Sequence, residues 1–188
     1  MNNPQNKKKI LVIRNDKIGD FMLAWPSFAL LKKQYPEAEI TALVPSYTAE
    51  LARLCEWIDD VLIDEKKNSF LSDVTHLKNI IKKKHFDISI SLFSQTRTAC
   101  ALWLAGIKQR VGPATKIAQI FLNLRLRQRR SRSAKPEYEY NLDLIRYYIN
   151  INHDHAVDTP SPPYLRFEQE EISLLRKEIS KKHEIPDN

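Results

Sequence analysis

The chain has 188 residues, of which 43% are apolar and 28% charged, and this balance is typical of a globular protein. Two cysteines exclude a disulfide scaffold and a clustered zinc site. No two of the three glycines have the spacing of the glycine-rich loops that bind dinucleotides or nucleotide phosphates, so these loops are excluded. The first apolar run, residues 10–13, is too short for a signal peptide, and none approaches the ~20 residues of a membrane span. We therefore expect a soluble, unexported protein in a reducing compartment.

Short aliphatic runs alternate with amphipathic segments along the first 150 residues. The pattern predicts strands at residues 10–13, 40–44, 60–63, 88–93 and 109–111, and helices at residues 21–35, 47–57, 73–84, 96–104 and 139–149. Strands and helices that alternate through short links predict an α/β fold with a doubly wound parallel sheet. Three prolines at 160, 162 and 163 then predict a linker, and residues 168–183 have the pattern of a charged amphipathic helix.

The net charge of +7 is unevenly distributed. Residues 88–136 contain no Asp or Glu and ten basic residues, six of them between residues 125 and 135. Like charges this dense repel one another, which favours an anionic ligand at the predicted anion-binding residues Arg125, Arg127, Arg129, Arg130 and Arg132. A solvated basic loop is the alternative. Aromatic residues do not alternate with these bases, so the pattern for stacking single-stranded nucleic acid is missing.

The polar loop after the first predicted strand ends in Gly19-Asp20. Ligands of open α/β sheets bind outside the carboxyl ends of strands, and this loop lies there. Gly19 would let a ligand approach the backbone closely. Asp20 is placed where the positive end of a helix dipole stabilises a carboxylate. Its alternative role is that of a helix N-cap.

An ordered set of residues resembles the start of the ADP-heptose:lipopolysaccharide heptosyltransferases, glycosyltransferase family nine. The matching features run from residue 8 to residue 150: Arg14 after the first strand, Gly19-Asp20, Pro26, Tyr35-Pro36, Ile58-Asp59-Asp60-Val61, Arg110-Val111-Gly112 and Tyr140-Asn141-Leu142-Asp143-Leu144. The resemblance implies a GT-B enzyme of two Rossmann-like halves, of which this chain matches the N-terminal one.

The resemblance also implies a chemistry. Residues 1–158 would form the acceptor-binding domain, and residues 159–188 a proline-rich linker and helix leading to a nucleotide-sugar domain absent from this chain. The family transfers heptose from ADP-heptose to a Kdo- or heptose-bearing lipid A precursor, with inversion and without a bound metal or other cofactor. Asp20 takes the position of the proposed general base, which accepts the proton of the acceptor hydroxyl. The chain alone is expected to be inactive, because the donor half is missing.

Further residues are predicted to bind the acceptor. Lys17 shares the loop with Asp20 and could bind a carboxylate or phosphate, or remain a solvated lysine. Ser94, Gln95, Thr96 and Arg97 follow another strand end and could bind the acceptor sugar, or merely cap the next helix.

Two other function classes are consistent with the sequence. One is a non-catalytic flavodoxin-like domain that binds an anionic ligand or partner, and the other is a nucleic-acid binder, which has only charge in its favour. The preferred hypothesis predicts no nucleic-acid partner. It places the protein in the cytoplasm, at the inner face of the bacterial inner membrane, where the acceptor and anionic lipids are its partners.

Overall fold

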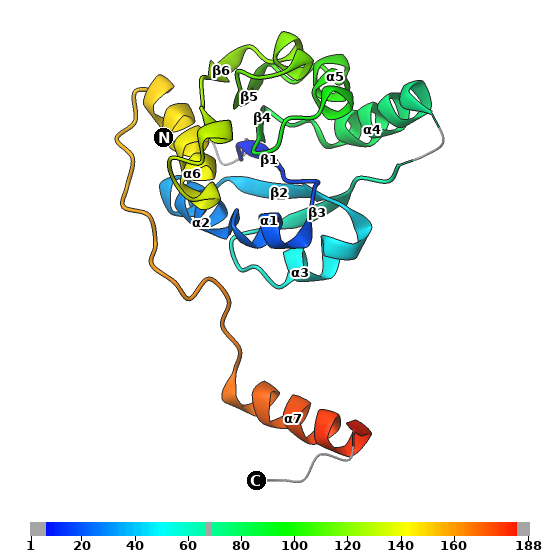
Figure 1. The fold of residues 1–188 in the computed structure, drawn as a ribbon, viewed down its shortest axis with the longest axis vertical. Coiled ribbons are helices and arrows are strands. Elements are labelled where there is room, and N and C mark those ends of the chain that lie inside the picture. The colour runs from blue at the N-terminus through cyan, green and yellow to red at the C-terminus, as the bar shows by residue number, and fades with distance from the viewer. Residues whose placement is uncertain (1–6, 67–68, 184–188) are drawn as a thin grey trace.

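A six-stranded parallel sheet forms the centre of the protein (Figure 1). The computed structural model describes residues 7–66 and 69–183. The strand order is β3-β2-β1-β4-β5-β6. The strands are β1 (Lys9–Ile13), β2 (Glu39–Val44), β3 (Asp60–Ile63), β4 (Ile88–Ser91), β5 (Gln109–Pro113) and β6 (Leu124–Leu126).

The central strand, β1, is buried on both faces. Ile10 and Val12 belong to one core cluster and Leu11 and Ile13 to the other, and none of the four is exposed. Successive side chains of a strand point to opposite faces, so a continuous aliphatic run fills both layers. From β1 the chain adds β2 and β3 on one side of the sheet, and then adds β4, β5 and β6 on the other side. The order in which the strands are added therefore reverses beside β1.

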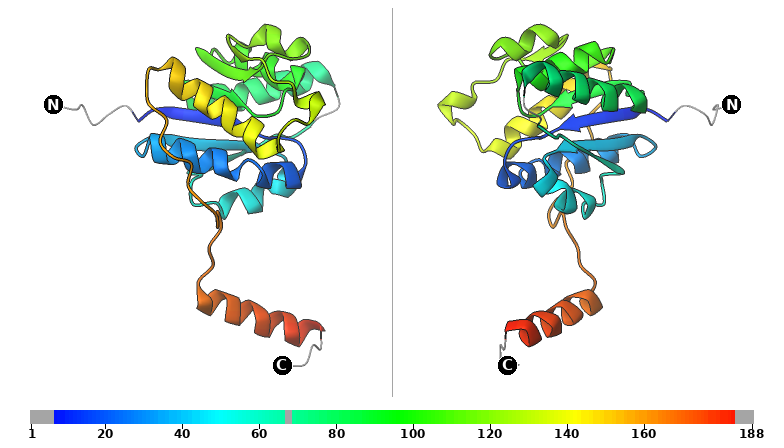
Figure 2. Two further views of the ribbon diagram at one scale, coloured as in Figure 1. Left: turned by 60° about the vertical axis from the view of Figure 1, so that its left-hand side comes forward. Right: turned by 90° about the vertical axis from the view of Figure 1, so that its right-hand side faces the viewer.

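Helices cover both faces of the sheet (Figure 2). One layer contains α2 (Trp25–Gln34), α3 (Ala49–Arg53) and α6 (Glu137–Ile151), and the other contains α4 (Phe70–Lys84) and α5 (Thr96–Leu104). Three short 3-10 helices lie in the connections: η1 (Ser46–Thr48), η2 (Ile117–Phe121) and η3 (Arg130–Arg132). The predicted fold class, a doubly wound parallel α/β sheet of Rossmann type, is confirmed.

The predicted first helix is two helices in the structure. A five-residue helix, α1 (Ile18–Met22), ends at Leu23, and α2 begins at Trp25. Pro26 occupies the second position of α2, where a missing backbone N–H costs little. The single helix predicted for residues 21–35 is therefore wrong, and Asp20 lies within the first turn of α1 rather than before it. The helix predicted for residues 47–57 is likewise shorter, consisting of η1 and α3.

The basic segment contains a strand that the sequence did not predict. Leu124 pairs with Val111 of β5, and Leu124 and Leu126 pack against the core cluster beneath α2 and α6. Arg125 alternates with them and is exposed. β6 is an edge strand, where a charged side chain is tolerated and discourages pairing with other chains.

The last helix, α7 (Gln169–His183), stands apart from the sheet (Figure 1). It contains no buried residue, and the segment between α6 and α7 forms no regular element. The sequence predicts a domain over residues 1–158 and a linker with a helix over residues 159–188. Residues 1–6 of the first and 184–188 of the second lie outside the described residues. Within residues 7–66 and 69–183, no helix has both the length and the apolar character to cross a bilayer.

Candidate active site at the carboxyl edge of the sheet

A cavity of about 620 Å³ opens at the carboxyl edge of the sheet. Its lining comes from the segments that follow β1, β2, β3 and β4, so one edge of the sheet assembles residues that are distant in the sequence. The lining residues are Asn15, Asp16, Pro45, Ser46, Tyr47, Asp64, Glu65, Lys66, Phe93 and Gln95. Beside β1 the strand order changes direction, and this is the place where open α/β sheets bind ligands.

Arg14 is the centre of the charged network beside this cavity. Its side chain is only 2% exposed and leaves the end of β1 toward three carboxylates. Nε lies 2.9 Å from Oδ1 of Asp16, Nη2 lies 3.3 Å from Oδ1 of Asp20, and Nη1 lies 3.0 Å from Oε1 of Glu137. Nη1 also donates to Oδ1 of Asn141 over 3.2 Å. The planar guanidinium can serve several acceptors at once, and here it connects the Gly-Asp loop to the first two turns of α6.

The two loop carboxylates have different environments. Asp20 is 34% exposed, whereas the side chain of Asp16 is 12% exposed. Burial raises the pKa of Asp16 from 3.8 to about 6; Asp20 nearby also raises this pKa, while Arg14 lowers it. Asp20 therefore presents the more accessible carboxylate, and Asp16 is a second, more buried carboxyl group in the same segment.

Asp20 does not cap a helix. The N-cap residue of α1 is Lys17, which forms no side-chain cap bond, and Asp20 lies in the first turn. The carboxylate is still favourably placed near the positive end of the helix dipole. Its ion-pair partner is Arg14, so the loop directs the carboxylate toward the carboxyl edge of the sheet rather than toward the backbone of α1.

A second buried polar cluster supports the wall of the cavity. Asp64, at the end of β3, forms an ion pair with Arg97 and accepts a hydrogen bond from Nδ2 of Asn15. Asn15 Nδ2 also donates to the hydroxyl of Thr98 over 3.0 Å. These four residues are between 2% and 9% exposed. Because each charged group has a partner, the cluster can fix the ends of β1 and β3 against the start of α5.

The structure brings only some of the predicted acceptor-binding residues to the cavity. Gln95 lines it, whereas Ser94 lines a neighbouring cavity of about 260 Å³ and Thr96 begins α5. Arg97 does not line the cavity, because its guanidinium faces Asp64. Lys17 and Gly19 are both exposed on the loop. A Cβ built on Gly19 would meet no atom within 4 Å, so this backbone is open to close approach.

The predicted anion-binding arginines divide into two groups. Arg130 is half-buried and forms an ion pair with Glu137, which it shares with Arg14. Burial lowers the pKa of Arg130, and Glu137 opposes this effect. Arg130 lines the 260 Å³ cavity together with Lys116. The other four, Arg125, Arg127, Arg129 and Arg132, are exposed.

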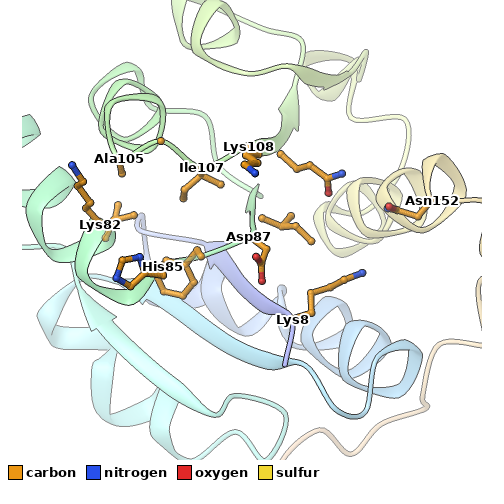
Figure 3. A pocket seen from close by; sticks show the side chains of 13 residues that line it. Lys8, Lys82, His85, Asp87, Ala105, Ile107, Lys108 and Asn152 are labelled. Carbon is orange, nitrogen blue, oxygen red and sulfur yellow. The ribbon is translucent and has the colours of Figure 1, made fainter. Parts of the chain in front are cut away.

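Another cavity, of about 640 Å³, lies at the opposite edge of the sheet (Figure 3). The C-cap residues of α4, α5 and α6, which are His85, Ala105 and Asn152, line it. Lys8, Lys82 and Lys108 also reach it, and cations complement the negative ends of helix dipoles. This cavity lies at the carboxyl ends of the helices and the amino ends of the strands. Ligands of open α/β sheets bind instead at the carboxyl ends of the strands, so this cavity is the weaker candidate.

Several site residues were missed by sequence reasoning. Glu137 and Asn141 meet Arg14 across more than 120 positions of the chain, and no local pattern indicates such a contact. Tyr47, Glu65 and Phe93 do carry a signal, because each follows a strand end as Asp20 does. In the part of the chain that the structure describes, no group of three His, Cys, Asp or Glu residues could hold a metal ion.

Comparisons with known proteins agree with this architecture. No family model matches the sequence. A Haemophilus influenzae protein named "Putative glycosyltransferase" is 54% identical over 169 residues, which are 90% of this chain and 48% of that protein. This chain thus spans about half the length of the relative.

Two solved structures share the fold. A glycosyl transferase family 9 protein from Veillonella parvula gives a TM-score of 0.78 with 19% identity, covering 96% of this chain and 51% of its own. The E. coli ADP-heptose lps heptosyltransferase II gives 0.72 with 22% identity, covering 92% and 50%. The chain is thus similar to a putative glycosyltransferase over about half of that protein's length, and it has the fold of about half of each of these two solved transferases.

Proposed function

We propose that this chain is the acceptor-binding half of an inverting glycosyltransferase that moves heptose from ADP-heptose to the inner core of lipopolysaccharide. The observation that carries the proposal is the ion pair between buried Arg14 and accessible Asp20 at the carboxyl edge of the sheet. A general base must be held within reach of the proton that it abstracts, and this ion pair fixes the position of the carboxylate.

The proposed reaction needs one base. The acceptor hydroxyl gives its proton to Asp20 while its oxygen bonds to the anomeric carbon of the donor. The bond from that carbon to the diphosphate breaks on the opposite face, so the configuration inverts and the nucleoside diphosphate leaves with the electron pair. The half of the protein beyond this chain would bind the donor. Residues 1–158 are accordingly the acceptor domain in this proposal, and residues 159–188 the connection.

The two adjoining cavities suit the two parts of a charged glycolipid head. Phe93 lines both of them. The larger one presents the side chains of Asp16, Glu65 and Tyr47 to polyhydroxyl groups. The smaller one presents Lys116 and Arg130, which suit a carboxylate or phosphate. A Kdo- or heptose-bearing lipid A precursor carries both chemistries, which supports it as the acceptor.

The proposal places the protein at the cytoplasmic face of the inner membrane. The exposed arginines Arg125, Arg127, Arg129 and Arg132 would face anionic headgroups, since each basic residue near such a surface contributes about 1 kcal/mol. This attraction is screened over about 8 Å at physiological salt. Binding through these arginines should therefore weaken steeply with added salt.

A transfer assay tests the proposal. The full-length protein is incubated with ADP-heptose and a Kdo-lipid A acceptor, and the product is analysed by mass spectrometry. We expect the acceptor to gain one heptose residue, and residues 1–188 alone to give no product. Transfer only from a different nucleotide sugar would overturn the proposed donor, and transfer only to an acceptor without Kdo or heptose would overturn the proposed acceptor.

A further inference from the structure

We propose that one exposed apolar surface of this domain inserts into an anionic lipid bilayer. The η2 surface consists of Trp103 and Leu104 at the end of α5 and Ile117 and Ile120 of η2. The arginine segment assigned to headgroups above adjoins it through Arg125. The inference extends the proposed function, because a lipid-anchored acceptor requires the enzyme at a bilayer, but it rests on observations of its own.

The exposure of these side chains is the first observation. Ile117 is 66% exposed, Ile120 is 73% exposed and Trp103 is 51% exposed. The same short helix buries its other side, since Ala118 and the following Leu122 form a small core with Ala99 of α5. Two isoleucines therefore point to solvent although the segment already has a packed face, and the transfer of such large aliphatic side chains out of water is favourable.

The surface is held in place from below. The ring of Phe121 contacts Trp103 at a centroid distance of 5.8 Å. Nε of Arg110 donates to the carbonyl of Phe121 over 2.7 Å, and Asn123 bonds the backbone of both Arg110 and Lys108. These bonds keep the apolar side chains on the outside, because the backbone that carries them is tied to β5.

Basic side chains lie beside the η2 surface. Lys116 directly precedes Ile117 and is exposed. Arg125 pairs in register with Gly112, whose added Cβ would meet Leu122, so Arg125 faces the side of the sheet that carries η2. The surface belongs entirely to the stretch of residues 88–136, which contains no acidic residue.

This combination fits a lipid surface better than a protein. Peripheral membrane segments place aliphatic and Trp side chains at the acyl boundary and Lys and Arg at the headgroups. The cores of protein–protein interfaces are depleted in Lys, and an obligate interface would need a larger apolar area than four side chains supply. Lipids with phosphate headgroups also match the local positive charge.

The position of the surface suits an acceptor held in the same bilayer. Lys116 and Thr115 line the 260 Å³ cavity, and η2 begins at the next residue. That cavity also contains Arg130, whose partner Glu137 contacts Arg14. A bilayer seated on η2 would therefore deliver an acceptor head to the edge of the sheet that carries Asp20. The regions of α5, β5 and β6 also lie remote from α7 (Figure 1).

The test is vesicle binding by the full-length protein. Vesicles of phosphatidylcholine and phosphatidylglycerol in equal amounts are compared with vesicles of phosphatidylcholine alone, using co-sedimentation at several salt concentrations. We expect the wild type to bind the anionic vesicles at least tenfold more tightly. The double variant Ile117→Ser/Ile120→Ser should bind them at least tenfold more weakly while keeping the salt dependence, since all charges remain.

The matched control removes two exposed leucines elsewhere, Leu54 after α3 and Leu71 of α4. Leu54→Ser/Leu71→Ser should bind as the wild type does. A second readout is quenching of Trp103 by brominated lipid, with Trp103→Phe as its reference, since Trp25 is buried and Trp57 is half-buried against the ring of Tyr164.

Three results would overturn the inference. The first is wild-type binding by Ile117→Ser/Ile120→Ser, which would leave the arginines as the only membrane contact. The second is equal binding to both kinds of vesicle. The third is an absence of vesicle binding together with a dimer that Ile117→Ser/Ile120→Ser dissociates, which would make the surface a contact between copies. Vesicle binding requires neither donor nor acceptor sugar, so its outcome is separate from that of the transfer assay.

Discussion

Arg14 and Asp20 form an ion pair in which the cation is buried and the carboxylate is accessible, with 3.3 Å between Nη2 and Oδ1. The guanidinium is also bound to Asp16, Glu137 and Asn141, so its position is fixed from three sides before any ligand arrives. A carboxylate held by such a group is preorganised. Asp20 itself is not among the residues that line the 620 Å³ cavity, and its neighbour Asp16 is. The ion pair thus contributes to the stability of the domain and also positions the proposed general base.

Replacing Arg14 tests how far the domain depends on this network. Arg14→Gln leaves three carboxylates without their shared cation, and breaking a buried ion pair in this way costs about 3–5 kcal/mol. We expect urea unfolding to show a loss of that size in the free energy of unfolding. Arg14→Lys keeps the charge but not the planar fork, so its loss should be smaller. A Gln variant as stable as the wild type would mean that the carboxylates find other partners.

The pKa of Asp16 predicts a pH dependence of stability. Burial raises this pKa from 3.8 to about 6, so the folded state binds the proton more tightly than the unfolded state does. The contribution of Asp16 to stability is therefore full below about pH 4 and is lost as the pH rises through about 6. Asp16→Asn lacks this titration.

Urea unfolding of the wild type and of Asp16→Asn at about pH 4, 5, 6 and 7 measures this difference. The free energy of unfolding of the wild type relative to the variant should fall across this range. A constant difference would show that Asp16 has the same pKa in both states, in which case Arg14 fully offsets the effect of burial.

Two glycines provide a matched pair of substitutions. A Cβ at Gly112 would lie 2.7 Å from Cδ1 of Leu122 and 3.3 Å from Cβ of Ser91, whereas a Cβ at Gly19 would meet nothing within 4 Å. Gly112→Ala should cost about 1–3 kcal/mol through overpacking between β5 and η2. Gly19→Ala should leave the melting temperature unchanged or slightly higher, because alanine favours helix.

The same two variants distinguish an effect on stability, measured by the melting temperature, from an effect on acceptor binding, measured by the KM. If Gly19 allows the acceptor to approach the backbone, Gly19→Ala should raise the KM for the acceptor of the full-length enzyme without changing its melting temperature. An unchanged KM would remove Gly19 from the acceptor site. A neutral Gly112→Ala variant would show that Leu122 moves aside at little cost.

The central strands could be predicted from the sequence because a strand that is buried on both faces has consecutive aliphatic residues. Residues 10–13 are aliphatic on both faces, which only a central strand needs. β6 escaped this reasoning, because an edge strand may carry arginine and has only three residues. The helix predicted for residues 21–35 failed at Leu23, since a continuous apolar stripe does not show where the helical hydrogen bonds stop.

The candidate site was predictable only in its local part. Gly19-Asp20 follows a strand, so its place at the carboxyl edge follows from the topology. The partners of Arg14 could not be predicted, because Glu137 reaches it from a helix 123 positions away. Arg97 illustrates the opposite case: it follows a strand end, as a ligand-binding residue would, yet its guanidinium pairs with buried Asp64.

The turnover number of the full-length protein carrying Asp20→Asn tests the central claim most directly. The amide keeps the shape of the side chain and cannot accept the proton, so kcat should fall by ~10²-fold or more, the usual worth of a general base. Asp158→Asn, an exposed aspartate beyond α6, serves as the matched control and should retain full activity. Asp158→Asn should unfold at the temperature of the wild type, and Asp20→Asn at most slightly below it, because Arg14 keeps Asp16 and Glu137 as partners. An Asp20→Asn enzyme with near-normal turnover would contradict the account, because the carboxylate beside Arg14 would then have no part in the transfer.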